Sequence, residues 1–359
     1  MKKSILFKKH NASGGKFEEQ DGWLLPAEFT GSFQEYTAAT TSVALMDRPY
    51  IGQLIVKGND HVDFLHRLTT NELRHLQPGQ GLVTIFANEK GRIIDRVGLL
   101  KQENEIRLLT SAGTDTKLTD WINKYIFLDD VHVENISTKT GLLSLFGPKA
   151  TSLLDRLFKQ STTNLKENDF IKYTWQNTLL IIHRGGEFNI PEYNVLIPEN
   201  LLVELWEKFC SVGEEFNLTL MGEKALEILR IEAGRPKYNR DFNEDMNPHE
   251  AGMFSFVNFE KGCYIGQEVI ARLDTYDKVQ KRLMGIILQS ERLPETQDKI
   301  MIDDQESGFI TSATFSYGLN KNIALGYIKT KYAGENKPVR IISKTDSLSG
   351  IITELPFSN

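Results

Sequence analysis

The stretch LIVKGNDHVDFLHRL, residues 54–68, contains the pattern on which the fold prediction rests. Its apolar start, Leu54 to Val56, indicates a short strand that ends at Gly58. Asn59 is a good N-cap residue for a helix. Apolar residues then recur at helical spacing, at Val62, Leu65 and Leu68. The stretch therefore predicts a strand, a glycine turn and a helix in direct succession.

A second stretch, LSLFGPKATSLLDRL at residues 143–157, repeats this order of strand, glycine and helix. In the alignment of the two stretches, the identical pairs are Leu54/Leu143, Gly58/Gly147, Leu65/Leu154, Arg67/Arg156 and Leu68/Leu157. A unit that occurs twice indicates two similar α+β lobes, because a solenoid needs further repeats to bury its core. The alternative is that two unrelated strand-to-helix units share a glycine and some leucines by chance.

The rest of the chain predicts more strands and helices. Two β-rich runs, residues 81–86 and 92–100, flank the turn-forming segment 88–91 and indicate a hairpin. After residue 278 the pattern changes to short β-rich runs broken by glycine and polar residues, which is typical of a small all-β barrel. The expected fold class is α+β: residues 1–278 form two interleaved α+β lobes, and residues 279–359 form a C-terminal all-β barrel.

The composition indicates a globular protein with more than one domain. The chain has 359 residues, of which 40% are hydrophobic and 25% charged, and its net charge is −6. This charge argues against strong general binding of nucleic acid. The basic N-terminus lacks the apolar core of a signal peptide, and no run is long enough to span a membrane. We therefore expect a cytoplasmic protein that does not bind membranes.

The cysteines and histidines give no sign of a metal site. Cys210 and Cys263 are far apart in the sequence and have no partner cysteine or clustered histidines nearby. Neither a disulfide framework nor a zinc or four-cysteine cluster site is therefore encoded. The 7 histidines are scattered without a regular ligand spacing, and we assign them no function.

Cys263 nevertheless has surroundings that favour chemistry. It lies in KGCYIGQE, residues 261–268, just before a helix predicted to start near Gln267. The positive end of that helix and the ammonium of Lys261 both favour the thiolate over the thiol. The pattern predicts a reactive cysteine, with Cys263 and Lys261 as candidate catalytic residues. The alternative is a buried cysteine that only fills space.

This octapeptide resembles the K-G-C-Y-x-G-Q-E signature of the YgfZ family, a relative of the glycine-cleavage T-protein, the GcvT-like aminomethyltransferase. LRIEAG, residues 229–234, is similar to an L-R-x-E-A-G stretch that the two share. NEKGRIID, residues 88–95, resembles their common N-E-x-G-x-I-x-D hairpin. Together these motifs make the resemblance cover roughly Ala44 to Arg282, and the predicted barrel fits the C-terminal domain of the family.

The resemblance has implications for both fold and function. It implies a GcvT-like folate-binding fold of three domains around a central channel that holds tetrahydrofolate or a one-carbon derivative of it. It also implies a role in the assembly or repair of iron–sulfur clusters, with iron–sulfur client or assembly proteins as partners.

Two positions depart from the aminomethyltransferase pattern. That enzyme has adjacent aspartates at the end of the hairpin, one of them catalytic, whereas this chain has Asp95 followed by Arg96. The T-G-E-x-G-x-E stretch at its folate site aligns poorly here and places Asn194 at the last acidic position, with Glu192 as the alternative for that role. Both changes argue against efficient aminomethyl transfer, because a carboxylate suits the folate ring nitrogens and the charge that develops at the transferring carbon.

A folate site should offer a carboxylate, an apolar slot and one or two arginines, because the ligand joins a pterin to an anionic glutamate tail. The candidates are Asp95, Arg230, Asn194 and Tyr264. Arg230 is distinctive because it lies in an apolar run, where a charge needs a partner, either the ligand or a structural glutamate such as Glu232. The remaining cations nearby fit a solvated basic surface: Arg235, Lys237 and Arg240.

Three functions are therefore compared. The first is a folate-binding accessory protein for iron–sulfur cluster assembly or repair, with Cys263 as its reactive group. The alternative is a tetrahydrofolate-dependent aminomethyltransferase of the T-protein type, in which Asp95 carries the catalysis. The third is an interaction scaffold that has kept the fold without the chemistry. The cysteine octapeptide favours the first function, and the missing second aspartate disfavours the alternative.

Overall fold

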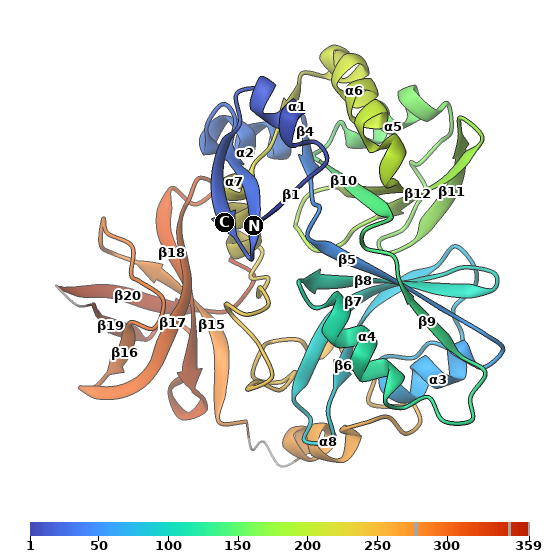
Figure 1. The fold of residues 1–359 in the computed structure, drawn as a ribbon. Coiled ribbons are helices and arrows are strands. Elements are labelled where there is room, and N and C mark those ends of the chain that lie inside the picture. Colours follow the sequence, from blue (N-terminus) through green and yellow to red (C-terminus); the bar gives the residue numbers. More distant parts are fainter. Residues whose placement is uncertain (276–278, 344–345, 358–359) are drawn as a thin grey trace. The chain divides into compact units, whose positions relative to one another are not determined.

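The structure is a computed structural model that describes residues 1–275, 279–343 and 346–357 (Figure 1). Contacts divide the chain into two compact units. Unit 1 contains Met1–His66, Glu72–Thr84 and Arg96–Leu226, and unit 2 contains Arg67–Asn71, Ile85–Asp95 and Glu227–Asn359. The predicted domain boundary at residue 278 lies outside the described residues. The predicted central channel concerns the placement of the units and stays a prediction.

Unit 1 begins with a small three-stranded sheet in the order β1-β3-β2. Its strands are β1 (Lys2–Lys3), β2 (Lys16–Gln20) and β3 (Trp23–Glu28). Helix α1 (Phe7–Ala12) lies between β1 and β2 in the chain, and α2 (Ser32–Thr41) follows β3. His10 of α1 lies 3.0 Å from the carboxylate of Asp47, and both side chains are buried. This contact attaches the N-terminal segment to strand β4 (Val43–Asp47).

The first predicted lobe forms a five-stranded sheet in the order β6-β7-β8-β5-β9. The strands are β5 (Ile51–Lys57), β6 (Gly81–Ala87), β7 (Ile93–Lys101), β8 (Glu105–Ala112) and β9 (His132–Asn135). Helix α3 (His61–Leu68) follows β5, and α4 (Asp115–Asn123) follows β8. The predicted hairpin is confirmed as β6 and β7.

The second lobe forms a six-stranded sheet in the order β11-β12-β13-β10-β4-β14. Its further strands are β10 (Thr140–Phe146), β11 (Phe170–Trp175), β12 (Thr178–Arg184), β13 (Glu192–Pro198) and β14 (Leu218–Leu220). Helices α5 (Ala150–Phe158) and α6 (Leu202–Gly213) belong to this lobe. The element order of the first lobe, strand, helix, three strands and helix, therefore recurs in the second.

The glycines that carry the sequence repeat occupy equivalent turns. Gly58 and Gly147 have φ angles of 117° and 115°, a region that residues with a Cβ rarely adopt. A Cβ would lie 2.0 Å from the backbone oxygen of Asp130 at Gly58 and 2.5 Å from that of Ser42 at Gly147. The repeat is thus confirmed as a structural one, and chance similarity is not needed to explain it.

The lobes also exchange edge strands. Strand β9, which precedes the second unit of the repeat, pairs with β5 of the first, and β4, which precedes the first unit, pairs with β10 of the second. This exchange makes the lobes interleaved. One local prediction was wrong: α3 begins at His61, and the Asn59 amide donates to Asp130 at 2.6 Å and does not cap the helix.

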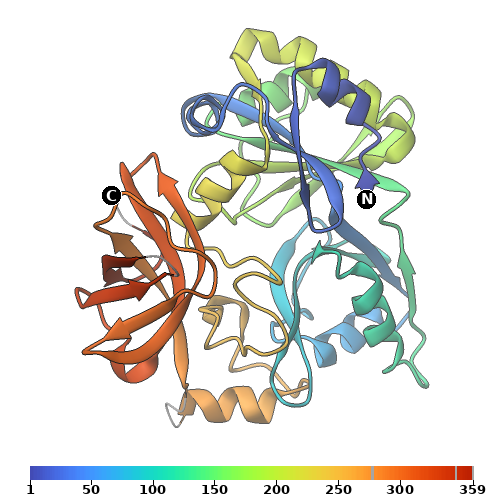
Figure 2. The ribbon, with the colours of Figure 1, turned by 60° about the vertical axis from the view of Figure 1, so that its left-hand side comes forward.

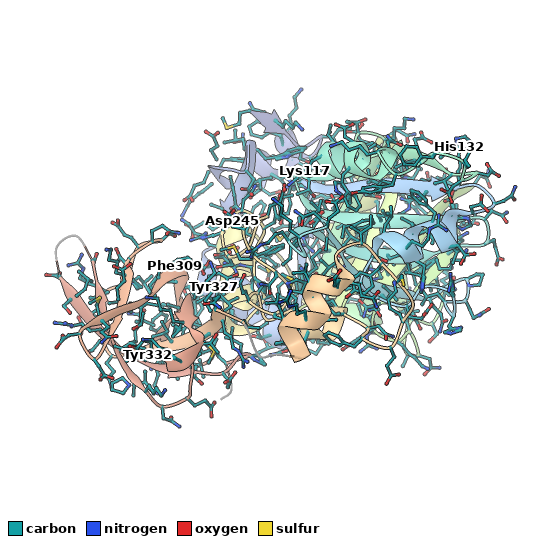
Figure 3. All side chains as sticks on the ribbon, turned by 90° about the horizontal axis from the view of Figure 1, so that it is seen from below. Lys117, His132, Asp245, Phe309, Tyr327 and Tyr332 are labelled. Atoms are coloured by element: carbon teal, nitrogen blue, oxygen red, sulfur yellow. The ribbon has the colours of Figure 1, made fainter. Side chains whose placement is uncertain are left out.

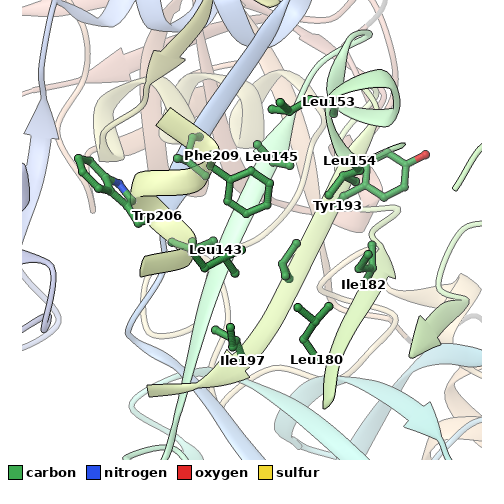
Figure 4. Packing of buried hydrophobic residues seen from close by; sticks show 14 of the residues in the cluster. Leu143, Leu145, Leu153, Leu154, Leu180, Ile182, Tyr193, Ile197, Trp206 and Phe209 are labelled. Atoms are coloured by element: carbon green, nitrogen blue, oxygen red, sulfur yellow. The ribbon is translucent and has the colours of Figure 1, made fainter. Parts of the chain in front are cut away.

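The core of the second lobe lies between its sheet and its helices (Figure 4). Figure 4 shows Trp206 and Phe209 of α6 beside Leu143 and Leu145 of β10. Fully burying each such side chain stabilises the fold by roughly 1.5–3 kcal/mol. The opposite face of the sheet has a second apolar cluster, which includes Leu142, Ile181 and Leu196 together with Leu100, Leu109 and Phe170.

Unit 2 includes most of α7 (Glu223–Glu232), then α8 (Gln267–Thr275) and a closed six-stranded barrel (Figure 2). The barrel strands are β15 (Lys281–Leu288), β16 (Lys299–Ile302), β17 (Gln305–Ser316), β18 (Lys321–Lys329), β19 (Pro338–Ile342) and β20 (Ser347–Thr353). Figure 3 labels Phe309 and Tyr327, whose ring centroids are 5.5 Å apart. The predicted C-terminal barrel is confirmed. In the described parts of the chain, no helix combines the length and apolar character that crossing a bilayer requires.

Candidate functional site

Cys263 lies in an irregular loop four residues before α8, and its side chain is exposed. The helix begins at Gln267, as the sequence predicts. Gly266, with a φ of 81°, makes a close approach possible: a Cβ there would lie 2.4 Å from the backbone oxygen of Asn88 at the end of the β6–β7 hairpin. The cysteine segment and the hairpin tip are therefore packed together within unit 2.

Lys261 is buried, and its ammonium contacts backbone carbonyl groups. Its Nζ donates to the carbonyl oxygens of Thr69 at 2.6 Å and of Asn71 at 2.7 Å. The ring of Tyr264 lies 5.2 Å from the same nitrogen. These contacts give Lys261 a clear role in holding the loop. Its predicted effect on the reactivity of Cys263 stays a prediction.

Tyr264 packs inside the apolar core of unit 2, in a cluster with Ile93 and Ile270. Burial raises the pKa of its phenol to about 12, so the hydroxyl keeps its proton at neutral pH. A predicted contact of Tyr264 with folate stays a prediction. The packing shows that the ring supports the loop that carries Cys263.

Asp95 is fully buried on β7, directly after the hairpin turn. The turn is built by Asn88, whose side-chain oxygen accepts hydrogen bonds from the N–H groups of Lys90 and Arg92, each at 3.0 Å. Arg92 also donates to Glu250 at 3.1 Å. A buried carboxylate on a well-fixed strand is a suitable catalytic group, because its position changes little when a substrate binds.

Arg230 of α7 is buried, and its partners are in the protein. Its Nε and Nη2 donate to Glu227 at 2.8 and 2.5 Å, and Nη1 donates to Asp241 at 2.6 Å. The remaining bonds go to the backbone oxygen of Arg235 at 2.7 Å and to Ser312 at 2.9 Å. A guanidinium has five N–H donors, and these contacts use them all.

This network gives Arg230 a structural role. It joins α7, the loop around Asp241 and strand β17 of the barrel, where Ser312 also donates to Asp241 at 2.7 Å. The suggested structural partner Glu232 was wrong, because that residue accepts instead from Ser316 at 2.5 Å. A bond from Arg230 to folate would require one of its present bonds to break, so its predicted binding role is not supported by these contacts.

Asn194 belongs to a different cluster, in unit 1. It lies on β13 opposite Ser144 of β10 and His183 of β12. Its side-chain oxygen accepts from the Ser144 hydroxyl at 2.5 Å, and its amide nitrogen lies 3.1 Å from Glu192 and 3.4 Å from His183. These polar groups occupy the same face of the sheet as apolar Leu196, because side chains alternate along a strand.

Glu192 is the charged centre of this cluster and is 1% exposed. Burial raises the pKa of its carboxyl group, and Glu187 adds to this effect, while Arg48 at 3.4 Å opposes it. Burial also lowers the pKa of His183 to about 4, so its imidazole is neutral at pH 7. Among the described residues, the buried Nε of Arg48 has no hydrogen-bond partner. The cluster thus combines an acceptor, the Glu192 carboxyl group, with an unused donor, the Nε–H of Arg48.

Arg96, which stands where the aminomethyltransferase pattern has a second aspartate, forms an ion pair in the same unit. Its Nη2 lies 2.7 Å from Glu187. The backbone N–H of Glu187 in turn donates to Glu192 at 3.4 Å. The replacement of a carboxylate by Arg96 is therefore matched by an acidic partner.

The predicted site residues fall in three places. In unit 2, Lys261, Cys263 and Tyr264 share one loop, and Asp95 lies on β7 beyond the hairpin turn next to that loop. The second place is the separate ion-pair network of Arg230, and the third is the cluster of Asn194 in unit 1. Sequence reasoning missed Arg48 and His183, since neither lies in a motif. Within the described ranges, no three His, Cys, Asp or Glu side chains are grouped so as to hold a metal ion.

Comparison with known proteins gives matches over nearly the whole chain. The model of the GCVT N-terminal domain matches residues 6–261, and that of the glycine cleavage T-protein C-terminal barrel domain matches residues 281–358. An aminomethyltransferase of Caldanaerobacter subterraneus is 30% identical over 99% of this chain and 96% of its own. A putative chloroplastic transferase of Arabidopsis thaliana is 31% identical over 97% of this chain and 78% of its own.

A solved structure has the same fold. The glycine cleavage system aminomethyltransferase T of Bartonella henselae superposes with a TM-score of 0.91 and 22% identity, over 99% of this chain and 98% of its own.

Proposed function

The chain belongs to the glycine cleavage T-protein family, and on that premise we propose that it is a tetrahydrofolate-dependent aminomethyltransferase. The observation that carries the proposal is the similarity, over the full length of both chains, to proteins named aminomethyltransferase. The confirmed α+β lobes and barrel agree with it. The order of preference from the sequence is thereby reversed, because the transferase, at first the alternative, has the stronger support.

The catalytic role in this proposal belongs to Asp95. When bound, tetrahydrofolate supplies the amine nitrogen that accepts the one-carbon unit. Positive charge develops at the transferring carbon as its bond to the donor breaks, and a buried carboxylate stabilises that charge. The attacking amine forms its bond to that carbon as the bond to the donor breaks, and the leaving group takes up the proton that the amine loses; the Asp95 carboxylate is a suitable relay for that proton.

Residues near a folate must fit it chemically. In unit 1, buried Glu192 and the unused Nε of Arg48 fit a polar heterocycle with both donors and acceptors. Arg230 does not fit as a partner for the glutamate tail, because its donors are used within the protein. Within unit 1, the proposal therefore assigns folate recognition to the cluster around Glu192 and Asn194.

The test is aminomethyl transfer from an aminomethylated carrier protein to tetrahydrofolate. Asp95→Asn should lower the rate by about 100-fold or more, since the substitution removes the charge and keeps the shape. Asp63→Asn is the matched control, because Asp63 is 60% exposed and pairs with Arg74 on the surface. Absence of turnover by the wild type, or an Asp95→Asn rate equal to that of the control, would contradict the proposal.

A second candidate function is supported by the exposure of Cys263 within the K-G-C-Y-x-G-Q-E segment. This function is a role in iron–sulfur cluster assembly or repair, with Cys263 as the reactive group. It is the role that the resemblance to the YgfZ subfamily implies. Complementation of a strain that lacks such a factor tests it, with the activity of an iron–sulfur enzyme as the readout. Cys263→Ala should abolish complementation, whereas Cys210→Ala should not. No aminomethyl transfer by the wild type, together with full complementation by Cys263→Ala, would indicate a scaffold.

A further inference from the structure

We propose that Arg107 and Gln53 form a binding site for a small carboxylate, separate from the residues that the proposed function assigns to folate. Arg107 lies on β8 and Gln53 on β5, two neighbouring strands of the first lobe in unit 1. As far as the structure describes the chain, neither side chain hydrogen-bonds to a residue assigned to folate. The site therefore goes beyond the proposed function.

The register of the sheet brings the two side chains together. Arg107 pairs with Ile55 of β5, and Gln53 pairs with Leu109 of β8. Since paired residues share a face and side chains alternate along a strand, Arg107 and Gln53 lie on one face of the sheet. Nη1 of Arg107 donates to Oε1 of Gln53 at 2.8 Å. This bond fixes the orientation of the Gln53 amide, because a guanidinium only donates.

Both side chains keep donors that no described protein group uses. The Nε of Arg107 is buried and has no hydrogen-bond partner among the described residues. In the same residues, the bond to Gln53 is the one hydrogen bond of this guanidinium, so the edge formed by Nε–H and Nη2–H is unused. Gln53 is 1% exposed, and its NH₂ group has no acceptor within the described ranges. Unpaired buried donors destabilise a fold unless water or a ligand accepts from them.

The positive charge of Arg107 also lacks a carboxylate partner. Its guanidinium forms no ion pair with the residues that the structure describes. Glu105, two positions earlier on β8, accepts instead from Gln102 at 2.7 Å. Burial lowers the pKa of Arg107, and Glu105 opposes this effect only in part. Because a buried charge is costly without an opposite charge, the guanidinium is suited to bind an anion.

The shape and charge of the site favour a carboxylate with one negative charge. The Nε–H and Nη2–H bonds of a guanidinium are parallel and match the two oxygens of a carboxylate, and the Gln53 amide offers a third donor. The nearby Glu105 repels a doubly charged anion such as phosphate. Leu100 and Ile55 pair with Arg107 on its two sides, and both are buried. These apolar neighbours suit a short aliphatic chain, as in butyrate.

The experiment is titration of the full-length ¹⁵N-labelled protein with butyrate, acetate and inorganic phosphate, with chloride keeping the ionic strength constant. The NMR signal of the Arg107 Nε–H group, identified by its absence in Arg107→Lys, should shift with butyrate and acetate. The expected dissociation constants are about 1–10 mM, with phosphate about tenfold weaker. Both carboxylates should also raise the midpoint of thermal unfolding, because they bind the native state.

Three variants sharpen the test, with the rise of the unfolding midpoint on adding butyrate as their common readout. Arg107→Lys keeps the charge and loses the bidentate edge, so butyrate should bind about tenfold more weakly. Gln53→Glu supplies a carboxylate from the protein itself, so its midpoint without ligand should rise and the effect of butyrate should disappear. Arg156→Lys is the matched control, because Arg156 pairs with Glu215 on the surface, and it should respond like the wild type.

The contrary outcomes are specific. Equal shifts with butyrate, phosphate and chloride would show a general ion effect and overturn the inference. A response to butyrate that is unchanged in both Arg107→Lys and Gln53→Glu would place the carboxylate elsewhere and overturn it as well. Tighter binding of phosphate than of butyrate would contradict the carboxylate assignment. Aminomethyl transfer is measured separately, so none of these results decides the proposed function.

Discussion

The two buried charge clusters, around Arg230 in unit 2 and Glu192 in unit 1, are built in opposite ways. Arg230 makes hydrogen bonds of 2.5–2.9 Å with all of its donors. Glu192 makes contacts of 3.1–3.4 Å, and its neighbour Arg48 keeps a buried Nε without a partner among the described residues. We call the Arg230 cluster complete, because all of its donors are paired within the protein. We call the Glu192 cluster incomplete, because its contacts are long and one buried donor is unpaired among the described residues.

The difference shows how to assign buried charges. A complete cluster needs nothing from outside and holds parts of the fold together. An incomplete one leaves groups unsatisfied, each of which costs about 1–3 kcal/mol, unless water or a ligand pairs with it. The comparison assigns stability to Arg230 and recognition to Glu192, although the sequence nominates Arg230 for binding.

The largest effect is expected where the complete cluster is broken. Arg230→Ala removes the buried cation that Glu227 and Asp241 share and should lower the free energy of unfolding by about 3–5 kcal/mol, as measured by denaturant titration. Arg156→Ala, which removes a pair that is 59% exposed on both sides, should cost below about 1 kcal/mol. If Arg230→Ala loses no more free energy of unfolding than the control but loses folate affinity, Arg230 serves binding and the assignment of stability to its cluster is wrong.

Acid should weaken the same cluster. Burial raises the pKa of Glu227, but Arg230 and Arg240 outweigh it and lower the pKa to about 2. The lowered pKa gives stability that is present above the ordinary value of 4.5 and is lost as the pH falls through about 2. This contribution is about 3 kcal/mol at most. Chemical denaturation between pH 5 and 2 should show that the free energy of unfolding falls with pH in the wild type and falls less in Glu227→Gln. The same dependence on pH in both proteins would contradict this prediction.

Arg96→Asp tests the incomplete cluster without touching Glu192. The new carboxylate faces Glu187 and repels it, so the loop that orients Glu192 should loosen and tetrahydrofolate binding should weaken by about tenfold. Arg96→Gln, which removes the charge alone, should have a smaller effect. Tighter tetrahydrofolate binding and faster aminomethyl transfer in Arg96→Asp would contradict this role of Arg96. They would show instead that the position needs the second aspartate of the aminomethyltransferase pattern.

The smallest effect on stability is expected at Cys263. Because the side chain is exposed, Cys263→Ser should change the free energy of unfolding by no more than about 0.5 kcal/mol. Its thiol should nevertheless alkylate faster than that of Cys210, since burial, followed by Glu207 and Glu214, raises the pKa of Cys210 to about 12. Mass spectrometry of the folded protein at neutral pH measures both rates, and faster modification of Cys210 would contradict the prediction.

The sequence predicts those parts of the fold that depend on local pattern. Gly58 and Gly147 mark the repeated turn because both positions need a positive φ, and the hairpin and barrel follow from alternation and turn residues. The start of α3 was misplaced because Asn59 bonds to Asp130, which is distant in sequence.

The site was harder to predict because its contacts join distant strands. Ser144, His183 and Asn194 come together only through the register of β10, β12 and β13. Arg230 indicated correctly that a buried charge needs partners, but Asp241 and Ser312 are brought to it by the loop and barrel. No local motif marks Arg48, so the donor of the recognition site was missed.

The most direct test of the account is proton release when tetrahydrofolate binds. Burial raises the pKa of Glu192, so any carboxyl group that is protonated before binding must ionise to accept the pterin donors. His183, with a pKa of about 4, is neutral at neutral pH, and Arg48 stays charged. Binding heats measured in phosphate and in an amine buffer should differ for the wild type, with affinity rising with pH, and should coincide for Glu192→Gln. Equal heats for the wild type in both buffers, with an affinity independent of pH, would contradict the assignment of recognition to Glu192.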